Sequence, residues 1–361
     1  MTEESIRLAD LTTMRVGGPP RALIRPGTAD ELIAAVAAAV AVADEWLVLG
    51  GGSNVVAPDD GLDATVVLTG GVRGIESIAA ADGRIHLRVA AGERWDDVVA
   101  FAVDRGLAGI EALSGIPGST GAAPVQNIGA YGQEIADVLH AIELYDAASG
   151  EVERIAAAEL GLGYRTSALK QGREGVVLSV ELALTPAREG EIRYEQLANA
   201  LGVQAGSLAP LAAIRDSVLG LRRAKGMLDD GELPSCGSFF VNPIVDENWA
   251  RSLPADAPRW PVGAADADLA APLDEGPRDR VYPDRRDVKL SAAWLIEHAG
   301  IARGFAIPGS RAAISPKHTL AIVNSGGAAA RDVVQLAEFV QMRVSQEFGI
   351  NLRPEPVILG P

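Results

Sequence analysis

The chain has 361 residues, of which 48% are hydrophobic, and this predicts two or three globular domains rather than a disordered chain. The net charge of −16 argues against nucleic acid or an anionic membrane as the main partner, because either would require a basic face. One cysteine excludes an intramolecular disulfide, and no apolar run reaches the roughly 18 residues of a membrane span. The acidic N-terminal stretch is unlike a secretory signal, so we expect a cytoplasmic protein.

The first predicted elements lie between residues 28 and 68. A helix is predicted over Thr28–Asp44, where Thr28 is a candidate N-cap with Glu31 at the capping-box position. A short buried strand is predicted over Trp46–Leu49, and a second over Thr65–Leu68. The first strand leads directly into a glycine-rich turn made of Gly50, Gly51, Gly52, Ser53 and Asn54.

This glycine-rich turn does not fit a Rossmann fingerprint. That fingerprint requires G-x-G-x-x-G opening a helix, with an acidic residue about 20 positions later. Here the glycines lead to Val55-Val56 and then to a turn over Pro58–Gly61. A βαβ nucleotide fold is therefore disfavoured, and a phosphate-cradling loop and an ordinary tight turn both remain open.

The middle of the chain alternates strand and helix patterns around one long loop. Strands are expected over Ile85–Ala91 and Val176–Leu184, and a hairpin over Ala141–Tyr145 and Glu151–Ile155. A helix is expected over Trp95–Arg105, with Gly106 as its stop signal.

The long loop, Gly115–Gly132, reads GIPGSTGAAPVQNIGAYG and holds five glycines, two prolines and no charged side chain. Glycine and proline exclude a regular helix or a central strand here. Glycine permits close approach of the backbone to a ligand, and successive free N–H groups form an anion-binding nest. Ordinary connections are much shorter, so we interpret this loop as wrapping a phosphate-bearing cofactor rather than as a simple surface loop.

The last third is predicted to contain three helices, one strand and a surface excursion. The helices are Leu208–Lys225, Lys289–Gly300 and Arg331–Phe348, the strand is Thr319–Asn324, and the excursion is Pro254–Pro283. The four histidines lack the spacing of a metal site, so we predict no metal and an ordinary structural role for each: His86, His140, His298 and His318.

Seven stretches occur in a characteristic order along nearly the whole chain: LTTMRVGG, LGGGSNVV, GIPGSTGAAPVQNIGAYG, GYRTSALK, CGSFFVNP, VKLSAAWLIEHAG and LRPEPVIL. Together they resemble the UDP-N-acetylenolpyruvoylglucosamine reductase family. The resemblance implies an α+β fold of three domains, of which two form an FAD-binding fold of the vanillyl-alcohol-oxidase/PCMH type and the third is an α+β substrate-binding domain. The expected boundaries are 1–72 with 349–361, 73–222, and 223–348, so that the final strand returns to the first domain. The stretch Ala255–Asp284 departs from the family because it is longer.

The resemblance also implies a reaction and its cofactors. FAD would be the bound cofactor and NADPH the co-substrate. The reaction would reduce the enolpyruvyl group of UDP-N-acetylglucosamine enolpyruvate to give UDP-N-acetylmuramate for peptidoglycan. The partner is then a UDP-sugar, and no nucleic acid, membrane or obligate protein partner is inferred.

Three catalytic residues follow from the family motifs. Arg165 would stabilise the substrate carboxylate with a bidentate guanidinium. Ser238 would donate a proton to carbon, and Glu355 would assist in a protonated form, since an ionised carboxylate would oppose the developing negative charge. The alternatives are a turn hydroxyl for Ser238, a surface ion pair for Arg165 and an exposed position between two prolines for Glu355.

The family motifs also indicate binding residues. Tyr194 would fold over the substrate, or would be a half-buried packing residue. Lys225 and Lys289 would approach the UDP phosphates, and Asn242 the substrate. The cofactor contacts are expected from Gly50, Gly51, Gly52, Ser53, Asn54, Gly118, Ser119, Gly121, Gln126 and Ile128.

Two other functions remain open on the sequence. An FAD oxidase or dehydrogenase of the same fold would keep the flavin loops, but has no reason to keep the GSFF-NP stretch and Glu355. A non-catalytic sugar-nucleotide-binding protein would bind ligand and would be colourless, whereas the reductase is expected to be yellow.

Overall fold

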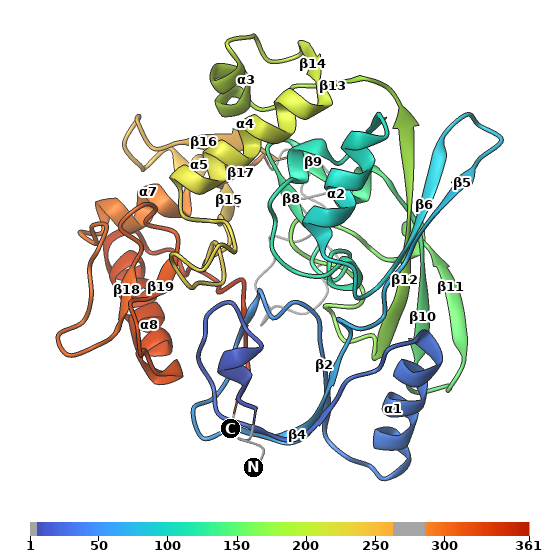
Figure 1. Ribbon diagram of the computed structural model, residues 1–361. Coiled ribbons are helices and arrows are strands. Elements are labelled where there is room, and N and C mark those ends of the chain that lie inside the picture. Colours follow the sequence, from blue (N-terminus) through green and yellow to red (C-terminus); the bar gives the residue numbers. More distant parts are fainter. Residues whose placement is uncertain (1–5, 263–285, 361) are drawn as a thin grey trace. The chain divides into compact units, whose positions relative to one another are not determined.

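The computed structural model describes residues 6–262 and 286–360. The chain forms two compact units, one made of Met1–Pro234 with Ile358–Pro361 and the other of Ser235–Val357 (Figure 1). Most of the Ala255–Asp284 excursion predicted from the sequence lies outside the described residues. The finer division at residues 72, 222 and 348 stays a prediction.

The first unit begins with a small parallel sheet in the order β1 (Pro20–Ile24), β4 (Leu62–Leu68), β2 (Trp46–Leu49). Helix α1 (Ala29–Ala41) starts as predicted, because the Thr28 side chain accepts a hydrogen bond from the Glu31 amide at 3.2 Å. Its buried Leu32 and Val36 pack with Val67 of β4.

No helix follows the glycine-rich turn after β2, as expected. The next element is the short strand β3 (Val55–Val56), which pairs with β20 (Val357–Ile358). The Leu359 amide donates a hydrogen bond to the Val56 carbonyl at 3.0 Å. The chain therefore returns to the first unit at Ile358, whereas the segment before it, through Val357, belongs to the second unit.

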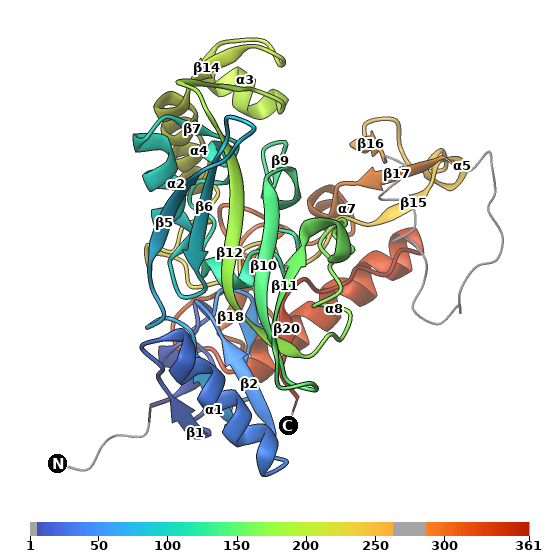
Figure 2. The ribbon, with the colours of Figure 1, turned by 90° about the vertical axis from the view of Figure 1, so that its right-hand side faces the viewer.

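The main sheet of the first unit follows the order β11 (Val152–Ala156), β10 (Leu139–Asp146), β12 (Gly175–Pro186), β6 (Ile85–Ala90), β5 (Ile75–Ala79). Its neighbouring strands are antiparallel, and β7 (Leu107–Ala108) pairs with the end of β12. Figure 2 shows β6, β12 and β10 side by side. Helix α2 (Trp95–Asp104) belongs to the same core as this sheet, which includes Trp95, Leu87, Ile142 and Leu182.

Smaller elements complete the first unit. Strands β8 (Gly129–Ala130) and β9 (Gln133–Glu134) form one hairpin, and β13 (Glu189–Glu191) pairs with β14 (Leu208–Pro210) on either side of α3 (Glu195–Leu201). Single 3₁₀ turns occur at Leu8–Asp10, Glu111–Leu113, Thr120–Ala122, Ile135–Asp137 and Ala157–Glu159.

The helix predicted from Leu208 begins later than expected. Helix α4 spans Leu211–Ala224, because Leu208–Pro210 forms strand β14 and Pro210 is the N-cap. The prediction was wrong over those three residues, since it could not anticipate a strand partner at Glu189–Glu191.

The second unit contains a sheet in the order β15 (Ile244–Asp246), β17 (Asp287–Leu290), β16 (Arg259–Pro261) and a hairpin of β18 (Ala312–Ile314) with β19 (Ile322–Asn324). The helices among its described residues are α5 (Glu247–Ala250), α7 (Ala292–His298) and α8 (Ala330–Phe348). Across the described ranges 6–262 and 286–360, no helix is both long and apolar enough to cross a membrane.

The helix predicted over Lys289–Gly300 is also corrected. Lys289 lies in strand β17, and α7 begins at Ala292, where the Ser291 hydroxyl accepts a hydrogen bond from the Trp294 amide at 3.2 Å. The Ser291 cap sets the start of the helix, and Gly300, with a φ of +85°, follows its end as predicted.

Candidate active site

The two glycine-rich segments, Gly50–Asn54 and Gly115–Ile128, meet in the first unit. The Ser53 hydroxyl donates a hydrogen bond to the Pro117 carbonyl at 3.1 Å, and the Asn54 side-chain amide donates one to the Gln126 side-chain oxygen at 2.9 Å. Two segments that were both expected to contact the cofactor are therefore hydrogen-bonded to each other.

Glycine is required where the two segments touch. A Cβ atom added at Gly51 would lie 2.7 Å from the Cα of Gly118, and one added at Gly50 would lie 2.3 Å from the Ser119 hydroxyl. The neighbour of Gly51 is backbone, which cannot move aside as a flexible side chain does. The glycines therefore allow one backbone to approach the other closely, whereas the close approach to a ligand stays a prediction.

Three buried hydroxyls at this junction have no hydrogen-bond partner among the described residues: those of Thr12, Thr69 and Ser119. Thr12 precedes Thr13, whose amide donates to the Gly52 carbonyl at 3.1 Å, and the Thr69 amide donates to the carbonyl of Leu49, just before Gly50. An unsatisfied buried hydroxyl costs free energy, so it calls for a partner. The hydroxyls and the glycine junction suit a polar, phosphate-bearing ligand, and the residues present fit FAD.

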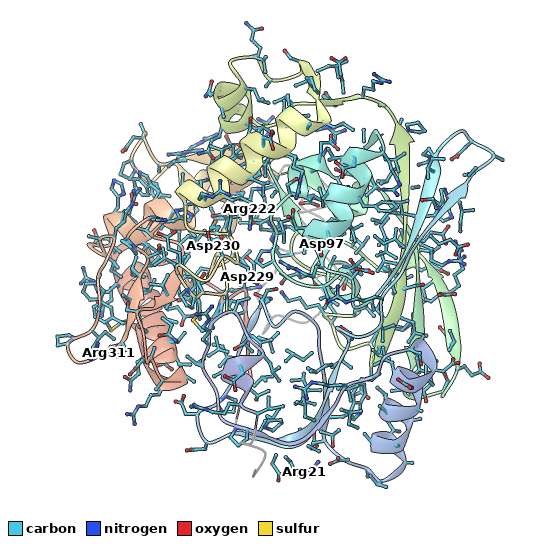
Figure 3. All side chains as sticks on the ribbon, viewed as in Figure 1. Arg21, Asp97, Arg222, Asp229, Asp230 and Arg311 are labelled. Carbon is cyan, nitrogen blue, oxygen red and sulfur yellow. The ribbon has the colours of Figure 1, made fainter. Side chains whose placement is uncertain are left out.

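Gly115, the first residue of the long loop, is held by two helices. The Asp96 carboxylate of α2 accepts a hydrogen bond from its amide at 2.6 Å, and the Arg222 guanidinium of α4 donates one to its carbonyl at 3.0 Å. Arg222, labelled in Figure 3, also donates to the Met227 carbonyl, and its burial lowers its pKa. Asp96 is in turn bound by both terminal nitrogens of Arg215 at 2.6 and 2.8 Å.

The ionisation of Asp96 depends on these contacts. Burial acts to raise the pKa of the Asp96 carboxyl, but the hydrogen bonds from Arg215 and from the Gly115 amide outweigh it, so this pKa lies below its ordinary value. The carboxylate is therefore charged at neutral pH and fixes the start of the loop through charge-assisted hydrogen bonds.

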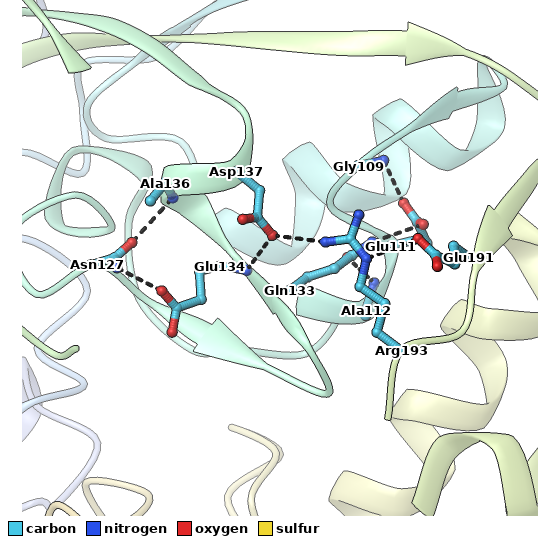
Figure 4. Close-up of polar contacts among 10 residues, drawn as sticks. All are labelled: Gly109, Glu111, Ala112, Asn127, Gln133, Glu134, Ala136, Asp137, Glu191 and Arg193. Atoms are coloured by element: carbon cyan, nitrogen blue, oxygen red, sulfur yellow. Dashed lines mark hydrogen bonds and ion pairs between the residues drawn. The ribbon is translucent and has the colours of Figure 1, made fainter. Parts of the chain in front are cut away.

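The far end of the loop is fixed by side-chain amides (Figure 4). The Asn127 amide nitrogen donates to the Glu134 carboxylate at 2.9 Å, and its oxygen accepts from the Ala136 amide at 3.1 Å. The buried Glu111 carboxylate accepts from the Gly109 amide at 2.7 Å and from the Gln133 side chain at 2.9 Å. These hydrogen bonds fix the backbone conformation on both sides of Tyr131.

Arg165 lies against this end of the loop. Its terminal nitrogens donate to the carbonyls of Asn127 at 3.3 Å and Gly129 at 2.7 Å. Its φ of +57° is in the left-handed region, which non-glycine residues adopt rarely. Backbone strain of this kind gathers at functional sites, so the conformation agrees with a role for Arg165 in ligand recognition.

Tyr131, Tyr194 and Lys225 form one cluster. The two tyrosine rings meet edge to face with centroids 5.8 Å apart, and the Lys225 ammonium lies 5.5 Å from the centre of the Tyr131 ring. The ammonium also donates a hydrogen bond to the Gln196 side chain at 2.8 Å. Tyr194 is 40% exposed. The first unit thus brings together Tyr194 and Lys225, two of the predicted substrate residues.

Burial and charge shift the pKa values of this cluster. Burial raises the pKa of the Tyr131 hydroxyl, against the opposing charge of Arg222. Burial lowers the pKa of the Lys225 ammonium, and the positive charge of Arg222 lowers it further. Lys225 therefore loses its proton more readily than an ordinary lysine does.

Ser238 and Glu355 belong to neighbouring stretches of the second unit. The Glu355 amide donates to the Phe239 carbonyl at 2.9 Å, and the Val241 amide donates to the Arg353 carbonyl at 3.0 Å. Both catalytic candidates are half-buried, so Glu355 is not simply exposed between its prolines. Phe239 is fully buried and anchors this pair of segments.

Asn242 and Lys289 lie close together in the same unit. The Asn242 side-chain oxygen accepts a hydrogen bond from the Ala292 amide at 2.9 Å, at the first residue of α7. The Leu290 amide donates to the Pro243 carbonyl at 2.9 Å, which holds the Lys289 strand beside the Asn242 segment. Asn242 therefore has a structural contact that the sequence did not reveal.

The predicted residues divide between the two units. Arg165, Tyr194, Lys225 and the cofactor loops lie in the first, and Ser238, Asn242, Lys289 and Glu355 lie in the second. The sequence missed the Asp96–Gly115–Arg222 contact, because an acidic residue in the first turn of α2 reads as ordinary charge–dipole stabilisation of a helix.

Comparison with known proteins identifies the family. Residues 20–156 match the family model "FAD binding domain", and residues 229–359 match "UDP-N-acetylenolpyruvoylglucosamine reductase, C-terminal domain". The chain is 56% identical to the UDP-N-acetylenolpyruvoylglucosamine reductase of Leifsonia xyli over 98% of each chain, and 46% identical to that of Nocardia farcinica over 99% of this chain and 89% of the relative.

A solved structure agrees with these matches. The crystal structure of UDP-N-acetylenolpyruvylglucosamine reductase from Thermus caldophilus superposes with a TM-score of 0.64 at 27% identity, over 98% of each chain. The chain therefore belongs to the UDP-N-acetylenolpyruvoylglucosamine reductase family.

Proposed function

We propose that this protein is an FAD-dependent oxidoreductase that uses NADPH to reduce the enolpyruvyl group of UDP-N-acetylglucosamine enolpyruvate. The product is UDP-N-acetylmuramate, a precursor of peptidoglycan. Family membership supports the reaction, and the observation that carries it on this chain is the gathering of unpaired buried hydroxyls at the junction of the two glycine-rich segments. With NADPH and a UDP-sugar as its small-molecule partners, the enzyme is proposed to act in the cytoplasm.

The cofactor is proposed to lie against the two glycine-rich segments. Bound FAD would supply the hydride that reduces the double bond, taking it from NADPH. The residues that would hold it are Gly50, Gly51, Gly52, Ser53, Asn54, Gly118, Ser119, Gly121, Gln126 and Ile128. These residues are small and carry no charge. The FAD phosphates would therefore accept hydrogen bonds from backbone amides and side-chain hydroxyls, as in anion-binding nests.

Arg165 is proposed to stabilise the substrate carboxylate. Hydride addition to the terminal carbon places negative charge on the neighbouring carbon, and this charge spreads into the carboxylate. A guanidinium whose orientation is already fixed by the carbonyls of Asn127 and Gly129 can grip that carboxylate without reorganising.

Ser238 and Glu355 are proposed to complete the proton chemistry. Ser238 Oγ delivers a proton to the carbon beside the carboxylate, and Glu355 acts in its protonated form as a hydrogen-bond donor to the developing charge. The hydrogen bond between Glu355 and Phe239 keeps Glu355 in register with the Ser238 segment, which supports a joint role.

Substrate binding is proposed to use Tyr194, Lys225, Asn242 and Lys289. Lysine ammonium groups serve as point charges for phosphates, so Lys225 and Lys289 would neutralise the UDP moiety. Tyr194 would close over the substrate, which its exposure and its edge-to-face contact with Tyr131 allow. The three proposed domains are 1–72 with 349–361, 73–222, and 223–348.

The proposed reaction is tested by NADPH oxidation that depends on the enolpyruvyl substrate, in deuterated water. The wild type should consume one NADPH per product and place one deuterium at the carbon beside the carboxylate. Ser238→Ala should keep its flavin and lose product formation by about 100-fold or more, because general acid catalysis contributes 10²–10⁴-fold. Undiminished deuterium incorporation in Ser238→Ala would remove this role from Ser238.

The two alternative functions predict different results in the same assay. An oxidase or dehydrogenase for another substrate would consume NADPH or oxygen without any dependence on the enolpyruvyl compound. A non-catalytic sugar-nucleotide-binding protein would be purified without visible flavin absorption.

A further inference from the structure

Two of the four histidines meet on the main sheet of the first unit, although 53 residues lie between them in the sequence. His86 of β6 and His140 of β10 have ring centroids 4.4 Å apart, and Glu181 of β12 lies between their strands. Glu181 Oε1 is 2.7 Å from His86 Nδ1 and 3.8 Å from His140 Nε2. The three candidate ligand atoms all lie within 4.8 Å of one another.

An irregularity in the sheet produces this arrangement. Leu139 pairs with Leu182 and Ala141 pairs with Glu181, so His140 is an extra residue in the ladder between β10 and β12. Such a bulge re-aims a side chain and is typical of functional positions. Without the extra residue, the alternation of the strand would direct His140 to the opposite face from Ala141 and its partner Glu181.

The surroundings of the cluster fix the carboxylate. Arg154 of β11 donates a hydrogen bond to Glu181 Oε2 at 2.9 Å, which leaves Oε1 as the atom near both imidazoles. The side chains of His86 and Glu181 are 12% and 11% exposed, whereas His140 is 45% exposed. Arg88, the cross-strand neighbour of Glu181, lies 3.7 Å from the carboxylate of Glu76.

We propose that His86, His140 and Glu181 form a binding site for a divalent transition-metal ion of the Zn²⁺ type. Two imidazole nitrogens and one carboxylate oxygen are a ligand set that zinc takes in proteins, and imidazole also suits copper and nickel. Tetrahedral ligands at 2.0–2.1 Å from an ion are about 3.3 Å apart. The separations of 2.7 and 3.8 Å from Glu181 Oε1 bracket that value.

The site would link three adjacent strands. A metal held by β6, β10 and β12 joins the centre of the sheet across two ladders, so its binding stabilises the folded state. The exposed side of His140 leaves one coordination position open to water. Arg154 orients the carboxylate as outer-shell partners of metal ligands do, but its charge opposes a cation, so the affinity is weaker than that of a structural zinc site.

The direct test is calorimetric titration of the FAD-containing protein with Zn²⁺ after chelator treatment. The wild type should bind one Zn²⁺ per chain and should melt at a higher temperature in its presence. His140→Ala should weaken this binding by more than about 100-fold, beyond the 10–100-fold typical of an outer-shell change. Because nearly half of the His140 side chain is exposed, this variant should fold, which retained flavin absorption would verify.

A matched control separates this site from general affinity for histidines. His298 is an exposed histidine of the second unit that stacks on Trp294 at 3.7 Å, and His298→Ala should leave Zn²⁺ binding unchanged. Glu181→Gln, which keeps the shape of the side chain, should weaken binding as His140→Ala does. Equal Zn²⁺ affinity in the wild type and His140→Ala, or the absence of saturable binding, would overturn the proposal.

Discussion

Ser119 shows at the level of one residue how an unsatisfied group points to a ligand. Its hydroxyl is buried without a partner in the described part of the chain, so protein contacts do not explain it. Ser114, by contrast, is also buried, but its hydroxyl donates to the Glu111 carbonyl at 2.7 Å. The two serines therefore allow a comparison between a hydroxyl that is proposed to bind a ligand and one that is hydrogen-bonded within the fold.

Ser119→Ala should lower FAD affinity by about fivefold, because a net hydrogen bond contributes roughly 1 kcal/mol. The melting temperature of the FAD-free protein should hardly change. Ser114→Ala should do the reverse, lowering that melting temperature with little effect on FAD affinity. Fluorescence titration with FAD and thermal melts of both variants check this, and a destabilised Ser119→Ala apoprotein with normal FAD affinity would contradict it.

Asp96→Ala should destabilise the protein by about 2 kcal/mol at pH 7, since it removes charge-assisted hydrogen bonds to Arg215 and Gly115. The pKa of Asp96 is depressed in the folded state, so its contribution is present above the ordinary aspartate pKa and is lost as the pH falls through the folded value. Urea unfolding should show a smaller difference between wild type and variant at acid pH.

Asp97 is the control for this experiment. It is the exposed neighbour of Asp96 on α2 (Figure 3), and Asp97→Ala should change stability by less than about 0.5 kcal/mol. If the Asp96→Ala difference stayed constant from neutral to acid pH, the ionised carboxylate would not be its source.

Because Lys225 is proposed to bind the UDP phosphates, its ionisation predicts a pH dependence of substrate binding. Burial and then Arg222 lower the pKa of its ammonium, so its charge is lost at a lower pH than that of an ordinary lysine. The KM for the UDP-sugar should therefore rise as the pH increases through this lowered pKa. Lys225→Arg, which remains charged, should remove this alkaline rise. An identical alkaline limb in both proteins would show that another group titrates.

At the level of the element, the sequence predicted those helices and hairpins that depend on contacts between residues close together in the chain. Helix α1 followed from the Thr28 cap, and the hairpin β10–β11 followed from two apolar segments around a turn. The strand at Lys289 and the strand at Leu208 were assigned to helices, because their partners Ile244–Asp246 and Glu189–Glu191 are distant in sequence. Short strands of this kind depend on pairing rather than on propensity.

In the candidate site, too, the sequence predicted local features and missed the contacts between distant elements. Glycine content predicted the two loops, but their contact with each other appears only in the structure, where glycine permits the close approach. The contact of Asp96 and Arg222 with Gly115, and the meeting of His86 with His140, depend on the packing of distant elements and on a bulge. No spacing within the sequence carries those signals.

The contact between the two glycine-rich segments predicts that alanine at Gly51 and alanine at Gly70 have very different effects on stability and FAD affinity. Gly51→Ala would place its Cβ 2.7 Å from the Gly118 Cα, so it should separate the loops, destabilise the protein by about 1–3 kcal/mol and abolish tight FAD binding. Gly70→Ala, where a Cβ would have nothing within 4 Å, should leave both properties unchanged. Equal FAD affinity in the two variants, measured by fluorescence titration, would exclude the junction as the flavin site.

At the level of the whole molecule, the proposed function depends on both compact units. The first carries the glycine-rich loops and Arg165, and the second carries Ser238 and Glu355. After Glu355 has passed beside Phe239, the chain returns to the first unit, where the Leu359 amide donates a hydrogen bond to the Val56 carbonyl. The last strand thus connects a proposed catalytic residue directly to the unit that is proposed to bind FAD.

The central claim is that bound flavin passes reducing equivalents to an enolpyruvyl substrate, and anaerobic stopped-flow spectroscopy tests it most directly. The purified protein is reduced with one equivalent of NADPH and mixed with UDP-N-acetylglucosamine enolpyruvate. We predict that the visible flavin absorption returns without oxygen and that one equivalent of UDP-N-acetylmuramate forms. A flavin that stays reduced until oxygen is admitted, or a protein that binds no flavin, would contradict the claim.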